Sequence, residues 1–329
     1  MIKYKVLLSI LCSAFVLSLQ ASVEKARFII NLESGQEQTV VAFGTSLTKV
    51  GAWVNQMQTA LDQSYPGLCT VINGARGGAN SDWGRDALES NVLAHQPDAV
   101  FIEFSVNDAM VMRQTSVEHA RGNLDNMIER ILATNAECEI ILQVMNPAVG
   151  SCLRQRPNLD AYNQMYRDAA KAHGLRLIDH YPAWNKILNE DPARFLRYVP
   201  DAIHPVRQGA LAVSTPVVLK GVGAPLAAPE LNYDTPCWTY LFRSRMDANK
   251  NREVTLEEYQ QFWRNHFDAQ DVDKNNELAL AEYGPAVLFA YIDANGDQRI
   301  DLSEYLAVYS EIFDEFDRNS DGLLCSEEH

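Results

Sequence analysis

Five short apolar segments between residues 40 and 179 constrain the fold of this chain more than any other feature. Apolar residues at helical intervals lie between them. Strands that alternate with helices in this way predict a parallel β-sheet with helices on both faces. The predicted strands span residues 40–43, 69–73, 98–104, 139–145 and 175–179. We also expect residues 27–32 to form an extra edge strand.

Ser46 follows the first predicted strand directly, in the sequence Gly44-Thr45-Ser46. A helical pattern starts at Val50, so the serine lies between a strand end and a helix start. Ligands bind at this end of the strands in open α/β sheets, and the positive end of a helix there favours a developing oxyanion. On its own, the pattern is also typical of a helix N-cap.

Three further segments place polar residues or glycines beside predicted strands and helices. Gly74–Gly78 follows the second strand, and Ser105–Asp108 follows the third. In Asp201–Pro205, the carboxylate lies three residues before a histidine, so it can bind the histidine Nδ1 and leave Nε2 for a serine. The proline suits the first turn of a helix, which we expect Pro216 to kink or end. Taken singly, the glycine-rich segment is also typical of a flexible turn, Asp201 of a helix cap and His204 of a surface histidine.

In their order along residues 39–219, these segments resemble the four sequence blocks of the SGNH (GDSL-like) hydrolases. The resemblance implies an α/β fold, a flavodoxin-like three-layer sandwich with a parallel sheet, and serine esterase activity that needs no catalytic cofactor. The blocks are matched by Gly44-Thr45-Ser46 with Leu47, by Gly78 or the neighbouring Gly77, by Ser105-Val106-Asn107-Asp108, and by Asp201 to Pro205.

The resemblance also implies a role for each matching residue. Ser46 would attack the ester carbonyl, His204 would take and return the proton, and Asp201 would support the imidazolium. The oxyanion would be held by the backbone N–H groups of Ser46 and Gly78 and by the side-chain amide of Asn107.

Two residues depart from the family pattern, and one other pair competes for the acid–base role. Thr45 replaces an aspartate and Ser105 replaces a glycine. Both changes can alter turn geometry and substrate fit, but neither removes a reacting group. Asp179 and His180 also close a strand. We rank them second because they lack the family spacing and the helix entry.

A twelve-residue pattern recurs four times near the C-terminus, at 247–258, 271–282, 293–304 and 317–328. Each copy has oxygen-bearing side chains at positions 1, 3, 5 and 12 and an apolar residue at position 8. The pattern resembles the EF-hand calcium loop, in which position 7 contributes a backbone carbonyl, and so implies a small all-α region with structural calcium. The implied ligands are Asp247, Asn249, Asn251, Glu253, Glu258, Asp271, Asp273, Asn275, Glu277, Glu282, Asp293, Asn295, Asp297, Arg299, Glu304, Asp317, Asn319, Asp321, Leu323 and Glu328.

The copies differ from the EF-hand pattern in their turns and spacing. Position 6 favours glycine, but the first three copies have Arg252, Asn276 and Gln298. A left-handed conformation costs roughly 1 kcal/mol or more for Arg and Gln, whereas Asn tolerates it. Only 12, 10 and 12 residues separate the loops, which allows one helix between neighbours. A dockerin-like module is the alternative, although Glu at each position 12 favours the EF-hand.

The net charge of −15 is concentrated in the C-terminal part. Residues 232–329 hold 21 acidic residues and 8 Lys+Arg, a charge of −13, which leaves −2 for residues 1–231. This distribution argues against nucleic acid or anionic lipid as a partner and favours hard cations.

The N-terminus predicts export. Lys3 and Lys5 precede an apolar run that is too short to span a bilayer and ends near Ala21, as in a secretory signal peptide. We therefore expect a secreted or periplasmic protein without stable membrane insertion. Removal of residues 1–21 leaves five cysteines, an odd number, so at least one thiol is unpaired in a monomer.

These observations predict four parts: a signal peptide at 1–21, an SGNH hydrolase domain at 22–219, a linker at 220–236 and an EF-hand-like domain at 237–329. The expected function is hydrolysis of acyl esters, foremost acetyl esters on small-molecule or polysaccharide substrates. Lipid, thioester and aryl esters are alternatives. A protein of another class would bind or anchor glycans with calcium and without hydrolysis, docking through its C-terminal region. We expect a chain that ends near Leu219 to hydrolyse small esters.

Overall fold

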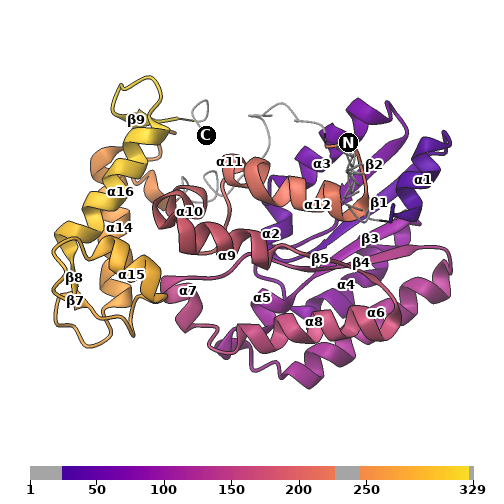
Figure 1. The fold of residues 1–329 in the computed structure, drawn as a ribbon, viewed down its shortest axis with the longest axis horizontal. Helices are drawn as coiled ribbons and strands as arrows, with labels where there is room; N and C mark the ends of the chain where they lie inside the picture. The colour runs from indigo at the N-terminus through magenta and orange to yellow at the C-terminus, as the bar shows by residue number, and fades with distance from the viewer. Residues whose placement is uncertain (1–23, 227–244, 326–329) are drawn as a thin grey trace, which may run out of the picture.

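The computed structural model describes residues 24–226 and 245–325. Its centre is a five-stranded parallel sheet with the order β2-β1-β3-β4-β5 (Figure 1), so the prediction of a parallel α/β sheet is confirmed. The strands are β1 (Gln38–Gly44), β2 (Cys69–Asn73), β3 (Ala99–Glu103), β4 (Glu139–Val144) and β5 (Arg176–Asp179). The predicted signal peptide and most of the predicted linker lie outside the described residues.

Helices cover both faces of the sheet (Figure 1). On one face α3 (Trp53–Ser64) packs against β2 and α12 (Thr215–Val222) against β5. On the other, α4 (Ser81–Asn91), α6 (Val117–Thr134) and α8 (Leu159–His173) lie side by side. Every residue of β3 is buried, as expected for a central parallel strand covered on both faces.

β1 and β3 are neighbours in the sheet, but the chain continues from β1 to β2 on one side and from β3 to β4 on the other. The strand order therefore reverses direction between β1 and β3. Both strands end at the same edge, where Ser46 begins α2 (Ser46–Lys49) and Ser105 begins α5 (Ser105–Asp108). Ligands of open α/β sheets bind at this switch point. The sheet topology thus brings two of the four sequence blocks together.

The expectation of an edge strand at residues 27–32 is wrong. This segment is the helix α1 (Arg27–Glu33), and its buried residues are Phe28, Ile29 and Leu32. These positions recur at i, i+1 and i+4, which places them on one face of a helix. That face packs against β1, so the segment buries its apolar residues as a helix on the sheet and not as a sixth strand at its edge.

The segment after His204 also differs from expectation. Pro205 precedes the helix instead of lying in its first turn, and Pro216 does not end it. The chain runs through α11 (Arg207–Gly209) and a π-helical segment (210–214) into α12, where Pro216 occupies the first turn. Because proline lacks an N–H, a wider π turn before it accommodates the missing α-helical bond. α12 continues to Val222, past the predicted domain end at Leu219.

The C-terminal region contains one helix between successive acidic loops, as the spacing predicts. The helices are α14 (Leu256–Gln270), α15 (Ala286–Ile292) and α16 (Leu302–Phe316). Their core is aromatic: the rings of Trp263 and Tyr309 stack with centroids 3.8 Å apart. Such a core suits a small region with few strands, because each ring buries a large apolar area.

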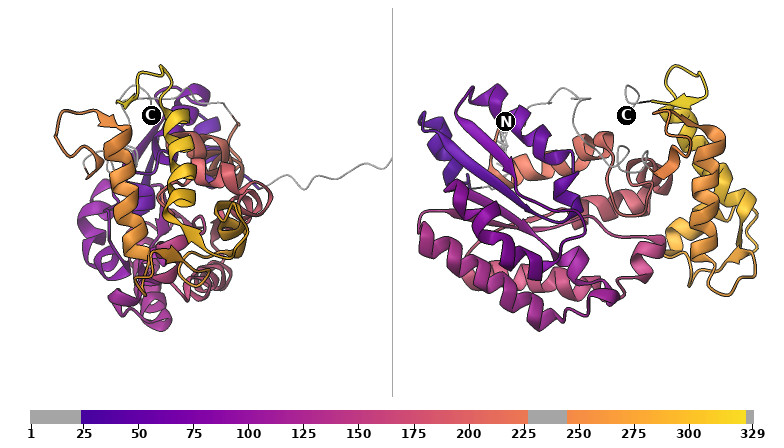
Figure 2. Two further views of the ribbon diagram at one scale, coloured as in Figure 1. Left: turned by 90° about the vertical axis from the view of Figure 1, so that its left-hand side faces the viewer. Right: turned by 180° about the vertical axis from the view of Figure 1, so that it is seen from behind.

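This region packs against the hydrolase part (Figure 2). α15 contacts α9 (Tyr181–Glu190) and α10 (Pro192–Tyr198), and one buried apolar cluster includes side chains of all three. Trp184 and Phe195 of the hydrolase part belong to it together with Leu288 of α15. A chain that ends near Leu219 would expose this face. Its hydrolysis of small esters stays a prediction.

Polar contacts reinforce this interface at the short helix α7 (Gly150–Arg154). The Arg154 guanidinium donates to the carbonyls of Glu282 (2.7 Å) and Gln270 (3.2 Å). The backbone N–H of Gly150 donates to the carbonyl of Gly284 (2.7 Å). α7 therefore contacts the chain on both sides of the second acidic loop, at Gln270 before it and at Glu282 and Gly284 at and after its end. The remaining short elements are the 3₁₀ turns Leu93–His95 and Val111–Arg113 and the strand pairs β6 (Val254–Thr255) with β9 (Leu323–Leu324) and β7 (Glu277–Leu278) with β8 (Ile300–Asp301).

The shared cluster predicts that the two parts unfold together. Phe195→Ala should lower the free energy of unfolding by about 3–5 kcal/mol, since it removes a fully buried ring between them. Urea denaturation followed by tryptophan fluorescence and by circular dichroism should shift as one transition. Ile30→Ala, at a half-exposed site, is the control and should change stability by about 0.5 kcal/mol or less. Two separate transitions, of which only one moves, would contradict the shared core.

Candidate active site

The turn after β1 presents Ser46 at the start of α2. Thr45 is the N-cap of this helix, and its Oγ1 accepts a hydrogen bond from the Leu47 N–H (3.2 Å). As the first helical residue, Ser46 has a backbone N–H with no carbonyl one turn earlier to accept it. Thr45, which departs from the family pattern, therefore supplies the cap that starts the nucleophile helix.

Ser46, His204 and Asp201 form a continuous hydrogen-bonded chain. His204 Nε2 lies 2.8 Å from Ser46 Oγ, and His204 Nδ1 lies 2.6 Å from Asp201 Oδ2. The Asp201 side chain is 1% exposed, whereas that of His204 is 19% exposed. Because a carboxylate can only accept, it fixes the proton on Nδ1 and leaves Nε2 free to take the serine proton.

Backbone donors hold the carboxylate of Asp201 in place. Its Oδ1 accepts the N–H groups of His204 (2.7 Å) and Ile203 (3.1 Å). Ala202 adopts a φ of +74°, a left-handed conformation that costs a non-glycine residue roughly 1–2 kcal/mol. The Ala202 carbonyl accepts the N–H of Val149, which immediately precedes α7 (2.9 Å). The strained turn is thus held by the segment that also contacts the C-terminal region.

Asn107 lies buried in α5, with its amide orientation fixed by two partners. Its Oδ1 accepts from the Arg156 guanidinium (3.4 Å), and its Nδ2 donates to the carbonyl of Ala79 (2.8 Å). Since arginine can only donate, the oxygen must face Arg156, and the second amide N–H is left for another acceptor. Gly78, beside Ala79, has a φ of +72°, which favours glycine. The amide group and the predicted oxyanion loop are therefore directly joined.

Glu103, at the end of β3, supports the nucleophile turn from behind. It is fully buried and accepts from the Thr45 N–H (2.6 Å), from Thr45 Oγ1 (2.9 Å) and from Thr48 Oγ1 (2.7 Å). A Cβ on Gly44 would lie 2.3 Å from Glu103 Oε1, so the glycine is required by the close approach of this carboxylate. Sequence reasoning missed Glu103, although a single charge inside an apolar strand was the available signal.

Burial changes the ionisation of two carboxyl groups at this edge. Desolvation raises the pKa of Glu103 to about 7, and the hydrogen bonds from Thr48 and Thr45 oppose this rise. Desolvation also raises the pKa of Asp108 to about 6, although its Oδ1 accepts the Ser81 N–H at 2.8 Å. Both shifts have the same cause: burial disfavours the charged form.

Ser105 and the competing pair at the end of β5 both serve the packing. Ser105 Oγ donates to Asn163 Oδ1 (2.9 Å) and so ties α5 to α8. His180 is fully buried against Gln143, and desolvation lowers its pKa to about 4. Asp179 is paired with Arg167 (2.8 Å). The pair is thus occupied by structural contacts.

The three described loops whose position 6 lacks glycine nevertheless adopt the left-handed turn there. φ is +72° at Arg252, +66° at Asn276 and +68° at Gln298, and Gly322 has +79° in the fourth loop. In each loop the position-1 carboxylate accepts the N–H of position 6, at 2.8 to 3.0 Å. These bonds offset part of the cost of the left-handed conformation. All four loops therefore have the same turn.

The four loops pair through their position-8 residues. Val254 of the first loop pairs with Leu324 of the fourth, and Leu278 of the second pairs with Ile300 of the third. These apolar side chains are buried. The constant apolar residue at position 8 therefore reflects a short antiparallel bridge between partner loops.

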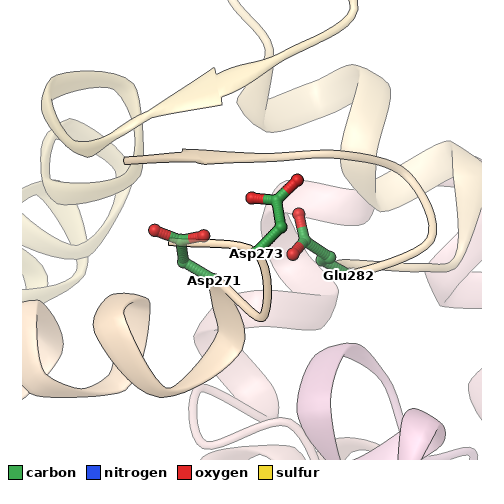
Figure 3. A group of neighbouring side chains, drawn as sticks. All are labelled: Asp271, Asp273 and Glu282. Atoms are coloured by element: carbon green, nitrogen blue, oxygen red, sulfur yellow. The ribbon is translucent and has the colours of Figure 1, made fainter. Parts of the chain in front are cut away.

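The second loop brings three carboxylates close together. The ligand oxygens of Asp271, Asp273 and Glu282 lie within 4.8 Å of one another (Figure 3). Oxygen donors at this spacing fit the preference of calcium for carboxylates and carbonyls. Asn275 and the Glu277 carbonyl belong to the same loop. The remaining predicted ligands belong to the other three loops. One of them, Glu328 of the fourth loop, lies outside the described residues.

Three described cysteines are poor nucleophiles. Burial raises the pKa of Cys69 and of Cys138 to about 12 and that of Cys152 to about 11. The thiolate is the reactive form, so these thiols are inert at neutral pH. Cys12 and Cys237 lie outside the described residues. None of the helices that the structure describes is long and apolar enough to cross a membrane.

The open α/β sheet and a serine–histidine–aspartate chain at its switch point define the class of serine ester hydrolases. The GDSL-like lipase/acylhydrolase family matches residues 41–212, more than half of the chain, and the chain belongs to this family. It is an SGNH-type ester hydrolase. The EF hand family matches residues 310–328, which include the fourth loop.

Solved structures share this fold over the hydrolase part. An α/β hydrolase enzyme from the metagenome of Lake Arreo, Spain, is 22% identical (57% of this chain, 96% of that chain, TM-score 0.50). An acetylxylan esterase from Geobacillus stearothermophilus is 19% identical (58% and 98%, TM-score 0.50). A GDSL-like lipase from Parabacteroides merdae is 18% identical (57% and 96%, TM-score 0.51). No curated protein matches the sequence.

Glu103→Gln should change how stability depends on pH. The pKa of Glu103 is about 7 in the folded chain, whereas a glutamate in the unfolded chain has a pKa of about 4.3. Because the folded chain holds this proton more tightly, the free energy of unfolding falls as the pH rises from about 4.3 to about 7. The variant should lose this fall, which amounts to on the order of 3 kcal/mol, while its Oε1 still accepts from Thr45. A smaller fall up to about pH 6 should remain because of Asp108.

Urea denaturation between pH 4 and pH 8 measures this effect. The control is Glu37→Gln, which removes the same charge from an exposed position and should keep the wild-type profile. A Glu103→Gln profile parallel to that of the wild type would show that Glu103 titrates like an exposed carboxyl group.

Proposed function

We propose that this chain is an exported serine esterase that removes acyl groups, foremost acetyl groups, from carbohydrate, with calcium as a structural ion in its C-terminal loops. One observation carries the catalytic part of the proposal. Ser46 Oγ, His204 and Asp201 are joined by contacts of 2.8 and 2.6 Å, in the order that nucleophilic acyl transfer requires.

The reaction begins with attack of Ser46 Oγ on the ester carbonyl carbon. His204 Nε2 takes the hydroxyl proton as the new C–O bond forms, and Asp201 stabilises the resulting imidazolium. The carbonyl oxygen becomes an oxyanion, which accepts hydrogen bonds from the Ser46 and Gly78 N–H groups and from the free Asn107 amide N–H. Each such donor contributes about 10²–10³ in rate.

Collapse of this intermediate breaks the bond to the alcohol oxygen. His204 returns its proton to that oxygen, and the alcohol leaves. A water molecule then gives its proton to the same imidazole and attacks the acyl-enzyme. The second collapse releases the carboxylic acid and restores the Ser46 hydroxyl. All proton transfers use one nitrogen, His204 Nε2, whose partial exposure gives water access.

An acetylated carbohydrate is the substrate class that we infer. The neighbour from Geobacillus stearothermophilus has the same fold and is an acetylxylan esterase, which supports the inference by analogy. The N-terminal sequence supports export, because Lys3, Lys5 and the following apolar run have the pattern of a signal peptide. A secreted or periplasmic esterase would meet extracellular polysaccharides.

Calcium is proposed as a structural ion because its loops are part of the shared interface. The second loop begins at Asp271, directly after Gln270, and ends at Glu282. The carbonyls of both Gln270 and Glu282 accept from Arg154 of the hydrolase part. An ion bound between Asp271, Asp273 and Glu282 would neutralise their repulsion where the two parts meet.

Ser46→Ala and His204→Ala should each lower kcat on p-nitrophenyl acetate and on acetylated xylo-oligosaccharides by about 10⁴ or more. The physical reason is loss of the nucleophile or of the group that takes its proton. A serine-directed phosphonate should label the wild type at Ser46, which mass spectrometry of peptides can show. Circular dichroism checks that both variants fold.

Asp179, beside the buried His180 at the end of β5, provides the matched control. Asp179→Asn removes a carboxylate beside a histidine but should keep the acyl-enzyme chemistry, because Asp179 binds Arg167 and the backbone N–H of Tyr181. Full activity of Ser46→Ala would refute the serine mechanism. An Asp179 variant as inactive as Ser46→Ala would reopen the acid–base assignment.

Calcium should raise the melting temperature of the whole chain in one transition. Each site filled at a hundred times its Kd adds about 2.7 kcal/mol to stability. Glu282→Gln should reduce the shift between EDTA and calcium, because it removes a carboxylate from the second loop. Scanning calorimetry measures the melting temperature, and titration calorimetry measures the number of sites. Glu257→Gln, exposed on α14, is the control. Identical melting curves in calcium and EDTA would exclude a stabilising ion.

A further inference from the structure

A small pocket adjoins the loop that carries Gly78. Its volume is about 250 Å³, and its walls include Arg76, Gly77, Gly78, Trp83 and Arg113. The two arginines and the tryptophan around this space supply no reacting group to the serine mechanism. They offer positive charge and an aromatic surface beside the loop that carries Gly78.

Neither arginine is neutralised within the part of the chain that the structure describes. No carboxylate among residues 24–226 and 245–325 forms an ion pair with Arg76 or Arg113. Instead, the Arg113 guanidinium donates to the Gly78 carbonyl, and the Arg76 guanidinium lies 5.9 Å from the centre of the Trp83 ring. Both side chains are therefore held at the pocket by contacts that leave their charge uncompensated.

The pocket is tied to the reacting groups through its backbone. The Arg76 N–H donates to the carbonyl of Gly44 (3.1 Å), two residues before Ser46. The Asn107 amide donates to the carbonyl of Ala79, another residue of the pocket wall. A group bound in the pocket would thus lie beside the oxyanion loop.

We propose that this pocket binds the anionic group of an acidic sugar, so that the enzyme deacylates a charged glycan in preference to a neutral one. This inference rests on the proposed function and adds the substrate class. Arginine presents a planar fork of donors that matches a carboxylate or sulfate group. Trp83 is partly exposed beside it and offers an apolar surface to the sugar ring.

The overall negative charge does not oppose this recognition at short range. Residues 232–329 carry −13 of the total −15, and the hydrolase part is nearly neutral. Exposed charges are screened beyond about 8 Å at physiological ionic strength, so the charges within the pocket dominate over those of the distant loops. Calcium in the loops would reduce the C-terminal charge further.

The test compares three acetylated oligosaccharides of equal length, which carry a carboxylate, a sulfate group or no charge. The wild type should show a higher kcat/KM on at least one charged substrate than on the neutral one. Arg76→Gln should lower this charged-to-neutral ratio by about tenfold to a hundredfold, mainly through KM, since a charge-assisted hydrogen bond is lost. Arg113→Gln should lower the ratio too and, because Arg113 also holds Gly78, should reduce kcat on all three substrates.

Arg27→Gln is the control for the change in net charge. Arg27 pairs with Glu137 near the start of β4, at the opposite edge of the sheet, so this variant should keep the wild-type ratio. A carboxylate-only preference would identify uronic acids, and a sulfate-only preference would identify sulfated sugars. Equal kcat/KM on charged and neutral substrates, or an unchanged ratio in Arg76→Gln, would overturn the inference.

Direct binding separates this inference from the proposed function. The Ser46→Ala chain, titrated with the non-acetylated charged and neutral oligosaccharides, reports the pocket without any hydrolysis. Tighter binding of the charged one, weakened about tenfold or more by adding Arg76→Gln, supports the pocket even if no tested ester is hydrolysed. Equal binding of both refutes it even if the esterase activity is established.

Discussion

The carboxylate of Glu103 is the contact on which the arrangement of the active site depends. It lies at the end of β3 and accepts from the backbone and hydroxyl of Thr45 and from the hydroxyl of Thr48, so it fixes the turn that follows β1. The same approach leaves no room for a side chain at position 44. A buried carboxyl group is costly, and the three donors offset part of that cost. The nucleophile helix thus starts from a rigid support.

The catalytic turn is supported from the C-terminal region as well. Ala202 lies between the aspartate and the histidine in a left-handed conformation, and the segment before α7 holds it through the Val149 N–H. In α7, Arg154 in turn donates to the carbonyl of Glu282, the last residue of the second acidic loop, and Gly150 donates to that of Gly284, two residues further on. A strained turn persists only where its surroundings over-determine it. The C-terminal region is therefore part of the scaffold around the active site, in addition to carrying its own loops.

Sequence patterns predicted the parallel sheet and the segments that meet at its edge, because apolar strands and helical intervals are local signals. They failed at residues 27–32, where a six-residue apolar pattern suits a strand or a helix equally and packing against β1 decides. At Pro216 they allowed either a kink or an end of the helix, and the helix does not end there because a π-helical segment before the proline keeps it continuous. The pairing of the first acidic loop with the fourth was beyond the sequence, since position 8 is apolar in every copy.

The sequence by itself determined the five strands of the sheet and the helices between them, the residues of the serine–histidine–aspartate chain and the positions of the acidic loops. Each of these depends on residue type and short-range spacing. Only the tertiary structure decided which groups surround them: Glu103 behind the nucleophile, Arg156 on the Asn107 amide, and the two arginines beside Gly78. Such residues act through contacts between segments far apart in the chain, and no local pattern marks a side chain whose partner is set by the fold.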